Sequence, residues 1–189
     1  CTFNFEMQDP TNEKQFISQL LDAKTQNQAF RKLISENKNQ LYYHIRNIVL
    51  NHDDTDDVLQ NTFIKIFSNL NSFNHESRLS TWMYKIATNE ALNFLNTKAK
   101  KYGLQTDELQ ESLIENLTMD DFFSGDEIEL KLQKAIATLP EKQQLVFKMK
   151  YFQELKYEEI AEILDTSVGG LKASYHHAVK KIENFIQNN

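Results

Sequence analysis

Apolar residues recur every three or four positions through most of the first hundred residues of the chain. This spacing gathers apolar side chains into one stripe of a helix and leaves polar side chains on the opposite face. It predicts short amphipathic helices over residues 13–21, 26–36 and 41–50, followed by two longer ones. The first longer helix runs from an acidic start at residues 53–56 to Leu70, and the second begins at an N-cap on Ser80 or Thr81. We expect these five helices to form one compact bundle that ends near Lys101.

The C-terminal part of the chain contains a second set of helical patterns, which begins at Glu129. Its first helix ends at Leu139, because Pro140 disfavours helical backbone in the residue before it. Pro140 itself suits the first turn of the next helix, which buries Leu145 and Met149. Between the two sets, the apolar residues of segment 102–127 show only patchy spacing. We therefore predict an all-α protein with two small helical domains, residues 10–101 and 128–189, joined by a linker over residues 102–127.

The composition agrees with a helical protein, because only two Pro and four Gly occur among 189 residues. The net charge of −6 is unevenly distributed: residues 78–101 hold five basic residues and one acid, whereas residues 102–127 hold eight acids and no basic residue. Charges act over a Debye length of about 8–10 Å, so the negative total does not exclude nucleic-acid binding by the basic segment. The like charges of residues 102–127 predict a flexible, solvated acidic linker.

The sequence contains no apolar run close to the roughly 20 residues needed to span a bilayer, so we expect no membrane insertion. Its first residues lack the basic flank and the apolar core of a secretion signal, and a cytoplasmic location is expected. The lone Cys1 excludes an internal disulfide framework and permits a reducing compartment.

Candidate catalytic chemistry is sparse in this sequence. His52-Asp53 is the dipeptide typical of metal-dependent phosphohydrolases of the HD class, which are all-helical proteins. Those enzymes need further His and Asp ligands, and here His52 is interpreted as the end of one helix and Asp53 as the cap of the next. The sequence has no Ser-His-Asp or Cys-His constellation and no Gly-rich phosphate loop. We therefore predict a protein that is not an enzyme, with no catalytic residues, no metal and no cofactor.

Two segments carry a resemblance to a known family. The strings DDVLQNTFIKIF (residues 56–67) and SFNHESRLSTWMYKIATNEALNFL (residues 72–95) resemble region 2 of the extracytoplasmic-function (ECF) sigma factors of the bacterial sigma-70 family. The string YEEIAEILDTSVGGLKASYHHAVKKI (residues 157–182), preceded by LPEKQQLVFKMKYFQEL, resembles the helix-turn-helix of region 4. The two matches stand in the order that is expected of the family.

The resemblance implies a sigma factor that directs core RNA polymerase to specific promoters and initiates transcription. It implies core RNA polymerase and promoter DNA as partners, and it makes an anti-sigma factor an expected third partner. In the family, the first helix of region 2 binds the clamp helices of the polymerase, and the following loop and helix read and open the minus-ten element. The linker threads the active-site cleft and the RNA exit channel. The main alternative is a stand-alone helix-turn-helix regulator, which would bind duplex DNA tightly without polymerase.

The resemblance also selects candidate residues in region 2. The polar face of the helix over residues 53–70 supplies the candidate polymerase contacts Asp57, Gln60 and Asn61. On the next helix, a lysine and two amides spaced to face one way suit phosphate anchoring combined with base-edge hydrogen bonds. Trp82 is interpreted either as a core residue or as a platform on which exposed bases stack. The candidate minus-ten residues are Asn74, His75, Ser77, Trp82, Lys85, Asn89 and Asn93.

The candidate minus-35 residues lie on the recognition helix, whose N-cap is expected at Ser167. The turn before this helix carries Asp165 where the family usually has Gly, so either Asp165 adopts left-handed backbone or the turn is reshaped. The helix reads SYHHA where the family commonly has Arg, so guanine recognition by guanidinium groups is largely absent. The candidate residues are Ser167, Lys172, Ser174, Tyr175, His176 and Lys180.

Overall fold

The computed structural model describes residues 10–104, residue 108 and residues 127–188, and every regular element in this part of the chain is a helix. Predicted segment 102–127 therefore lies mostly outside the described residues. The elements are α1 (Pro10–Leu21), α2 (Gln26–Val49), α3 (His52–Asn69), the short 3-10 helix η1 (Leu70–Ser72), α4 (Leu79–Tyr102), α6 (Glu127–Ala137), α7 (Glu141–Tyr151), α8 (Tyr157–Ile163) and α9 (Val168–Asn188).

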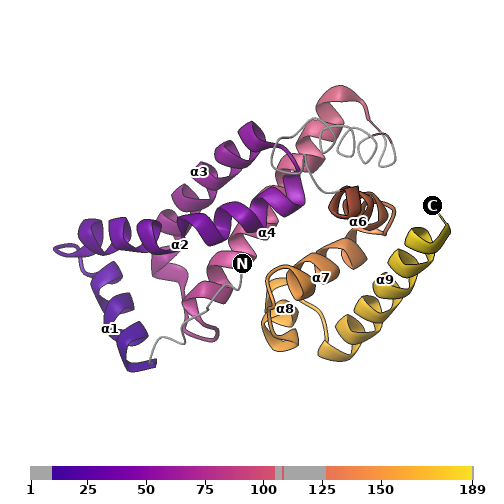
Figure 1. The fold of residues 1–189 in the computed structure, drawn as a ribbon. Helices are drawn as coiled ribbons and strands as arrows, with labels where there is room; N and C mark the ends of the chain where they lie inside the picture. The colour runs from indigo at the N-terminus through magenta and orange to yellow at the C-terminus, as the bar shows by residue number, and fades with distance from the viewer. Residues whose placement is uncertain (1–9, 105–107, 109–126, 189) are drawn as a thin grey trace.

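The helices form two groups that contact each other (Figure 1). In the first group, α2, α3 and α4 pack pairwise and α1 packs against α2. In the second group, α6, α7 and α8 all pack against α9. Helix α4 of the first group packs against α8 of the second, so it is the element through which the two groups chiefly meet.

Helix α2 is one helix of 24 residues, whereas the sequence pattern predicts two helices over residues 26–36 and 41–50. The polar run at residues 36–40 contains neither Pro nor Gly, so nothing in it breaks a helix. Leu33 and Leu41, on either side of this run, are both almost fully buried on the inner side of α2. The side-chain amide of Asn37 donates to the carbonyl oxygen of Leu33 (2.8 Å), which ties the polar run to the preceding turn.

The junction between α2 and α3 is a tight reversal. Leu50 caps α2 with left-handed backbone (φ 57°), and Asn51 is the N-cap of α3. The Asn51 side chain accepts a hydrogen bond from the backbone N–H of Asp54 (2.9 Å). Asp53 and Asp54 lie in the first turn of α3, where their carboxylates face the positive end of the helix. The acidic residues lie in the first turn as predicted, but the N-cap is Asn51 and not Asp53, and His52 is the first residue of α3 and not the end of the helix before it.

Helix α4 begins at Leu79, so the predicted N-cap at Ser80 or Thr81 is wrong. The N-cap residue is Arg78, which makes no capping hydrogen bond through its side chain. The backbone N–H of Leu79 instead donates to Oε1 of Glu13 on α1 (2.7 Å). A carboxylate from a distant part of the chain thus replaces the local cap that the pattern predicts.

The second group contains a helix-turn-helix made of α8, a short turn and α9. Asp165 lies in this turn with φ 47°, so of the two alternatives the structure shows left-handed backbone at Asp165. The Ser167 side chain accepts a hydrogen bond from the backbone N–H of Gly170 (3.2 Å), so its predicted N-cap role is confirmed. Leu171, Ala178 and Ile182 form the buried side of α9.

The larger apolar core extends across both groups. It contains residues of α1 to α4, and it continues through Val146 and Met149 of α7 to Ile160 and Ile163 of α8. A smaller core lies inside the second group between α6, α7 and α9. The two predicted domains are therefore packed against each other in this structure.

Candidate nucleic-acid interface

The outer face of α3 combines polar and apolar side chains. Asp57, Gln60 and Asn61, the candidate polymerase contacts, are all exposed. Ile64 and Phe67 continue the same face toward the end of the helix, with 57% and 39% of their surface exposed. Exposed apolar side chains of this size, next to polar ones, are typical of a protein-binding surface.

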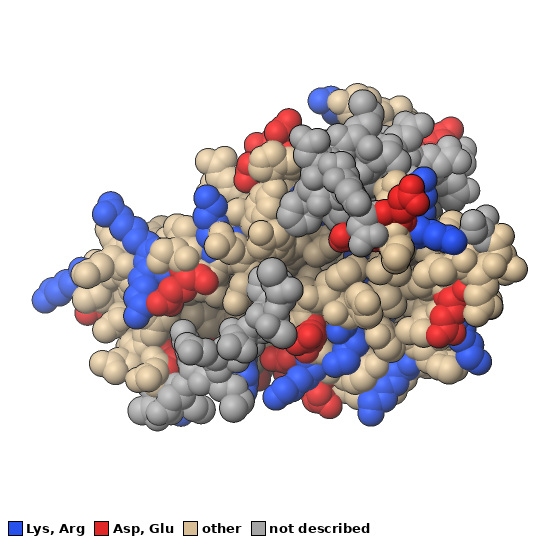
Figure 2. Space-filling model, viewed as in Figure 1, with Lys and Arg blue, Asp and Glu red and all other residues tan. Residues whose placement is uncertain are grey.

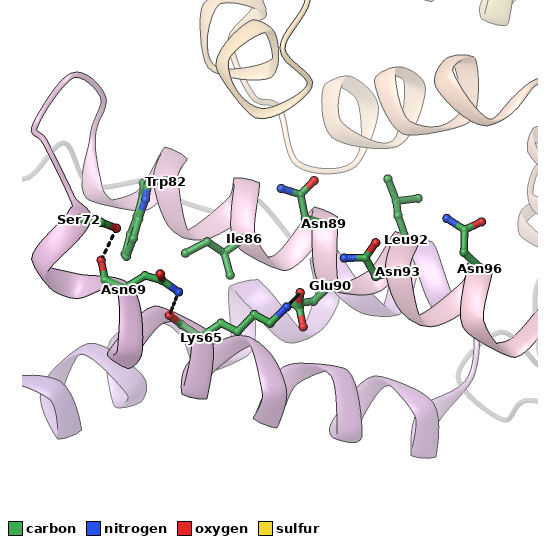
Figure 3. Close-up of a pocket in the computed structure, with 10 residues that line it drawn as sticks. All are labelled: Lys65, Asn69, Ser72, Trp82, Ile86, Asn89, Glu90, Leu92, Asn93 and Asn96. Atoms are coloured by element: carbon green, nitrogen blue, oxygen red, sulfur yellow. Dashed lines mark hydrogen bonds and ion pairs between the residues drawn. The ribbon is translucent and has the colours of Figure 1, made fainter.

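A groove of about 640 Å³ lies between α3 and α4 (Figure 3). Three candidate minus-ten residues, Trp82, Asn89 and Asn93, line it. The other lining residues were not among the candidates chosen from the sequence. Those on α4 could have been found from their helical spacing relative to Trp82 and Asn89. They are Lys65, Asn69, Ser72, Ile86, Glu90, Leu92 and Asn96.

The groove contains one acidic side chain, and that side chain is paired. Nζ of Lys65 lies 2.5 Å from Oε1 of Glu90, whose side chain is only 13% exposed. Figure 3 shows Lys65 extending along the groove to reach Glu90. In the part of the chain that the structure describes, the side chains of Asn89, Asn93 and Asn96 make no hydrogen bonds, so their donors and acceptors face solvent or the groove. The groove is therefore close to neutral and rich in unpaired amides.

Trp82 links the groove to the loop before α4. Its ring lies 5.2 Å from that of Phe73, which in turn lies 5.0 Å from the ring of His75. Trp82 is half-buried, so it contributes both to the core and to the groove wall. His75 has left-handed backbone (φ 61°) and is exposed, as is Asn74, while Ser77 is half-buried. The structure thus places these loop candidates next to the Trp82 end of the groove.

Lys85 is separated from the other candidate minus-ten residues. It lies on the side of α4 that faces the second group, and its Nζ is 2.6 Å from Oδ1 of Asp165 in the helix-turn-helix. The sequence pattern predicts that Lys85, Asn89 and Asn93 face one way. In the structure Asn89 and Asn93 line the groove and Lys85 does not.

Helix α9 presents a row of exposed cationic and imidazole side chains. Lys172, His176 and Lys180 are spaced four residues apart and are all exposed. His177, which was not selected from the sequence, is exposed beside His176, with the ring centroids 6.1 Å apart. Counting helical turns from the buried Leu171 would have placed His177 on this face.

Ser174 and Tyr175 lie closer to the interior of the second group. Both are half-buried. The Tyr175 ring stacks at 5.8 Å on Phe147 of α7 and meets Tyr157 of α8 edge-on at 6.4 Å. Burial raises the pKa of the Tyr175 hydroxyl, and neighbouring tyrosines add to this effect. Tyr175 therefore has a packing role in addition to its predicted role at DNA.

Charged side chains of both signs are mixed on the face that Figure 2 shows, where blue and red groups lie near one another. His52, the histidine of the HD dipeptide, lies 2.6 Å through its Nδ1 from the Tyr42 hydroxyl. Among the described residues, no three His, Cys, Asp or Glu side chains are close enough to hold a metal ion.

No helix described here has the length and apolar character needed to cross a membrane.

Comparison with known proteins identifies two family regions in this chain. The family described as "Sigma-70 region 2" matches residues 33–101, and the family described as "Sigma-70, region 4" matches residues 129–182. The ECF RNA polymerase sigma factor SigW of Bacillus subtilis is 30% identical over 159 residues, covering 78% of this chain and 83% of that protein. The ECF RNA polymerase sigma-E factor of Haemophilus influenzae is 30% identical over 167 residues, covering 84% of this chain and 88% of that protein.

Two solved structures share the fold. CnrH, in complex with the cytosolic domain of CnrY, aligns with a TM-score of 0.67 and 17% identity over 94% of this chain and 98% of that chain. The sigma factor RpoE of Bartonella quintana, in complex with the anti-sigma factor NepR, aligns with a TM-score of 0.63 and 17% identity over 84% of this chain and 96% of that chain.

Both sequence regions and the curated relatives lead to one conclusion. The chain belongs to the ECF group of the sigma-70 family of RNA polymerase sigma factors. It therefore directs core RNA polymerase to promoters and initiates transcription. The presence of region 2 together with region 4 disfavours both a stand-alone helix-turn-helix regulator and an HD hydrolase. The predicted all-α layout with two helical units is confirmed.

Proposed function

We propose that the α3–α4 groove and the adjoining loop bind the separated minus-ten strand of promoter DNA. The observation that carries this proposal is the set of amides without intramolecular partners, Asn89, Asn93 and Asn96, beside the half-buried ring of Trp82. Unpaired amides can hydrogen-bond base edges, and base–aromatic stacking contributes about 1–3 kcal/mol per base. Pairing of Glu90 with Lys65 supports the same use, because it removes the local negative charge that would repel a phosphate backbone.

The outer face of α3 is the proposed contact with core RNA polymerase. The polar side chains on this face, Asp57, Gln60 and Asn61, can form specific hydrogen bonds with a partner. The apolar side chains, Ile64 and Phe67, provide surface that binding would remove from water. This face lies on the side of α3 away from the first-group core, which contains Leu59, Phe63 and Ile66. It is available without any rearrangement of that core.

Helix α9 is the proposed reader of the minus-35 duplex. Its exposed Lys172, His176 and Lys180 can approach phosphates and base edges, and its start at Ser167 presents backbone amides. His177 extends this face. Contacts of Ser174 and Tyr175 with DNA stay predictions. DNA would reach these half-buried side chains from the edge of the helix. Under this assignment residues 10–101 and 128–189 are the two working domains, with residues 102–127 as the connection.

Three broader assignments complete the proposal. The chain acts as a binding protein without catalytic activity or cofactor of its own. It acts in the cytoplasm, where core RNA polymerase is found. An anti-sigma factor is a proposed partner, because both solved structures described above are complexes of this fold with CnrY or with the anti-sigma factor NepR.

The groove assignment can be tested with Asn89→Ala combined with Asn93→Ala, and with Asn39→Ala as a matched control. Asn39 is exposed on α2 and does not line the groove. Holoenzyme reconstituted with each variant would open promoters carrying 2-aminopurine in the minus-ten strand. The groove variant should slow opening about tenfold or more, and unequally across a library of minus-ten sequences, because base-edge contacts are lost. A uniform loss across the library would assign these amides to backbone contact instead.

A further inference from the structure

Helix α1 lies outside the parts of the chain that match the two family regions. The match to region 2 begins at residue 33, whereas α1 spans Pro10–Leu21. Its inner side nevertheless belongs to the larger core, in which Ile17 and Leu20 are buried. The helix is therefore a fixed part of the fold, and it can hold other elements in place.

The C-terminal end of α1 is tied to the start of α2. The Thr25 hydroxyl donates to the carbonyl oxygen of Gln19 (2.8 Å), and the side-chain amide of Gln26 donates to the carbonyl oxygen of Leu20 (3.0 Å). Both acceptors belong to the last turn of α1, where carbonyl groups have no partner inside the helix. These bonds fix the position of α1 against α2.

The first half of α1 supplies the cap that α4 lacks. The N-cap residue Arg78 makes no capping hydrogen bond through its side chain, and the backbone N–H of Leu79 donates to Oε1 of Glu13 (2.7 Å). The Glu13 carboxylate also faces the positive end of α4. Leu79 is buried (5% exposed), so water has little access to replace this acceptor, and an unsatisfied N–H there would be costly.

The same helix also contacts the element on the other side of the minus-ten loop, which is defined here as residues 73–78. This loop runs from η1 to α4, and η1 packs against α1. Helix α1 therefore holds both ends of the loop. Inside the loop, His75 has left-handed backbone (φ 61°), a conformation that persists in a residue other than Gly where the surrounding structure fixes it.

We propose that Glu13 is a positioning residue for the minus-ten loop. By capping α4 it fixes the direction in which this helix leaves the loop, and so the place of the loop candidates relative to Trp82. The proposal rests on the proposed binding of the minus-ten strand by this loop and the adjoining groove. It goes beyond that function, because it gives a role in promoter opening to a residue that need not touch DNA and that lies outside both family matches.

Two substitutions of Glu13 test its hydrogen bond. Glu13→Ala removes the acceptor, whereas Glu13→Gln keeps a side-chain oxygen at the same reach. Gln15→Ala is the matched control, because Gln15 is exposed on the same helix. Each variant would be made in the full-length chain and combined with core RNA polymerase. Promoter opening would be followed with 2-aminopurine in the minus-ten strand.

Glu13→Ala should slow promoter opening about three- to tenfold, the range expected when a helix loses one cap. Glu13→Gln should stay within about twofold of the wild type, and Gln15→Ala should equal it. Competition for core RNA polymerase should be the same for all of them, because the candidate contacts on α3 are unchanged. Equal opening by Glu13→Ala and Gln15→Ala, or equal slowing by Glu13→Gln and Glu13→Ala, would overturn the proposal.

Hydrogen exchange read by mass spectrometry reports on the loop itself. Peptides covering residues 73–82 should exchange faster in Glu13→Ala than in the wild type, while peptides from α2 keep their protection, because the cap is lost and the core remains. A purely structural role would instead lower protection throughout the first group and weaken polymerase binding as well. That result would reject a positioning role for Glu13.

The outcomes also separate this proposal from the function on which it rests. If Asn89→Ala with Asn93→Ala slows promoter opening and Glu13→Ala does not, only the positioning role fails. If the double amide variant opens promoters normally and Glu13→Ala slows opening, the groove assignment fails and the loop alone carries the minus-ten contact.

Discussion

Helix α4 has two polar sides that differ in where their hydrogen bonds go. On the groove side, Asn89 and Asn93 make no side-chain hydrogen bonds within the described part of the chain. On the docking side, which is the side of α4 that packs against α8, Thr88 bonds His44 and Lys85 pairs with Asp165. The polar groups of one side are left for an outside ligand, and those of the other side are satisfied by the chain itself. The difference indicates that one helix can carry both a surface left open to a ligand and a surface that packs within the chain.

The largest expected effect concerns the docking side and pH. Burial lowers the pKa of His44 to about 4, from an ordinary value near 6.5. The unfolded chain therefore takes up the proton first, and the stability contributed by neutral His44 is present above pH 6.5 and is lost as the pH falls toward 4. Between pH 7.5 and pH 5 this loss amounts to about 2 kcal/mol.

Urea unfolding of the wild-type chain and of His44→Gln at both pH values would measure this effect. Glutamine keeps hydrogen-bonding capacity and does not titrate, so the variant should lose about 2 kcal/mol less on acidification. Equal pH dependence of the two proteins would mean that His44 is accessible to protons in the folded chain.

The next effect concerns the groove side and its single acid. Lys65→Ala should leave the Glu90 carboxylate unpaired in the groove and weaken single-stranded minus-ten DNA binding by holoenzyme about three- to tenfold. Adding Glu90→Gln to Lys65→Ala should restore most of the affinity, because the uncompensated charge is then removed. Failure of this rescue would show that Lys65 contacts DNA itself.

A smaller effect is expected at α9, where duplex DNA is read by few cations. Lys180→Gln should reduce the dependence of log affinity on log salt by about 0.9, the contribution of one phosphate contact to B-DNA. Lys38→Gln, at an exposed position on α2, is the control. Fluorescence anisotropy with minus-35 duplex at several salt concentrations would measure both slopes, and identical slopes would remove Lys180 from the interface.

The smallest effect on stability is expected on the outer face of α3. Replacing Asp57, Gln60 and Asn61 by Ala should change the free energy of unfolding by within about 0.5 kcal/mol, because all three side chains are exposed. Competition for core RNA polymerase should nevertheless weaken. A triple variant that competes as well as the wild type does would place the polymerase contact elsewhere.

The features that could be predicted from the sequence depend on residues that lie close together along the chain. The left-handed Asp165 and the capping role of Ser167 follow from residues within one turn of each other, and both are present. The same reasoning placed the exposed candidates of α3 and most of those of α9. The continuity of α2 was missed because a polar run was interpreted as a break, although no helix-breaking residue occurs in it.

The features that the sequence could not predict are contacts between distant residues. Glu13 caps α4 across 66 positions, Lys85 meets Asp165 across 80, and His44 meets Gln153 across 109. Helical periodicity shows which side chains avoid water, but it does not show which surface covers them. The spacing of Lys85 relative to Asn89 could not show that the Lys85 ammonium meets Asp165 of the second group.

The position of Trp82 allows the groove to be monitored by intrinsic tryptophan fluorescence. It is the one tryptophan of the sequence, and its half-buried indole forms part of the groove wall. Indole emission responds to solvent and to stacked bases, so ultraviolet light excites a native probe at the point where a promoter strand would lie. Stopped-flow recording of that emission during mixing with a single-stranded oligonucleotide would follow entry into the groove in real time, without any dye attached to the protein.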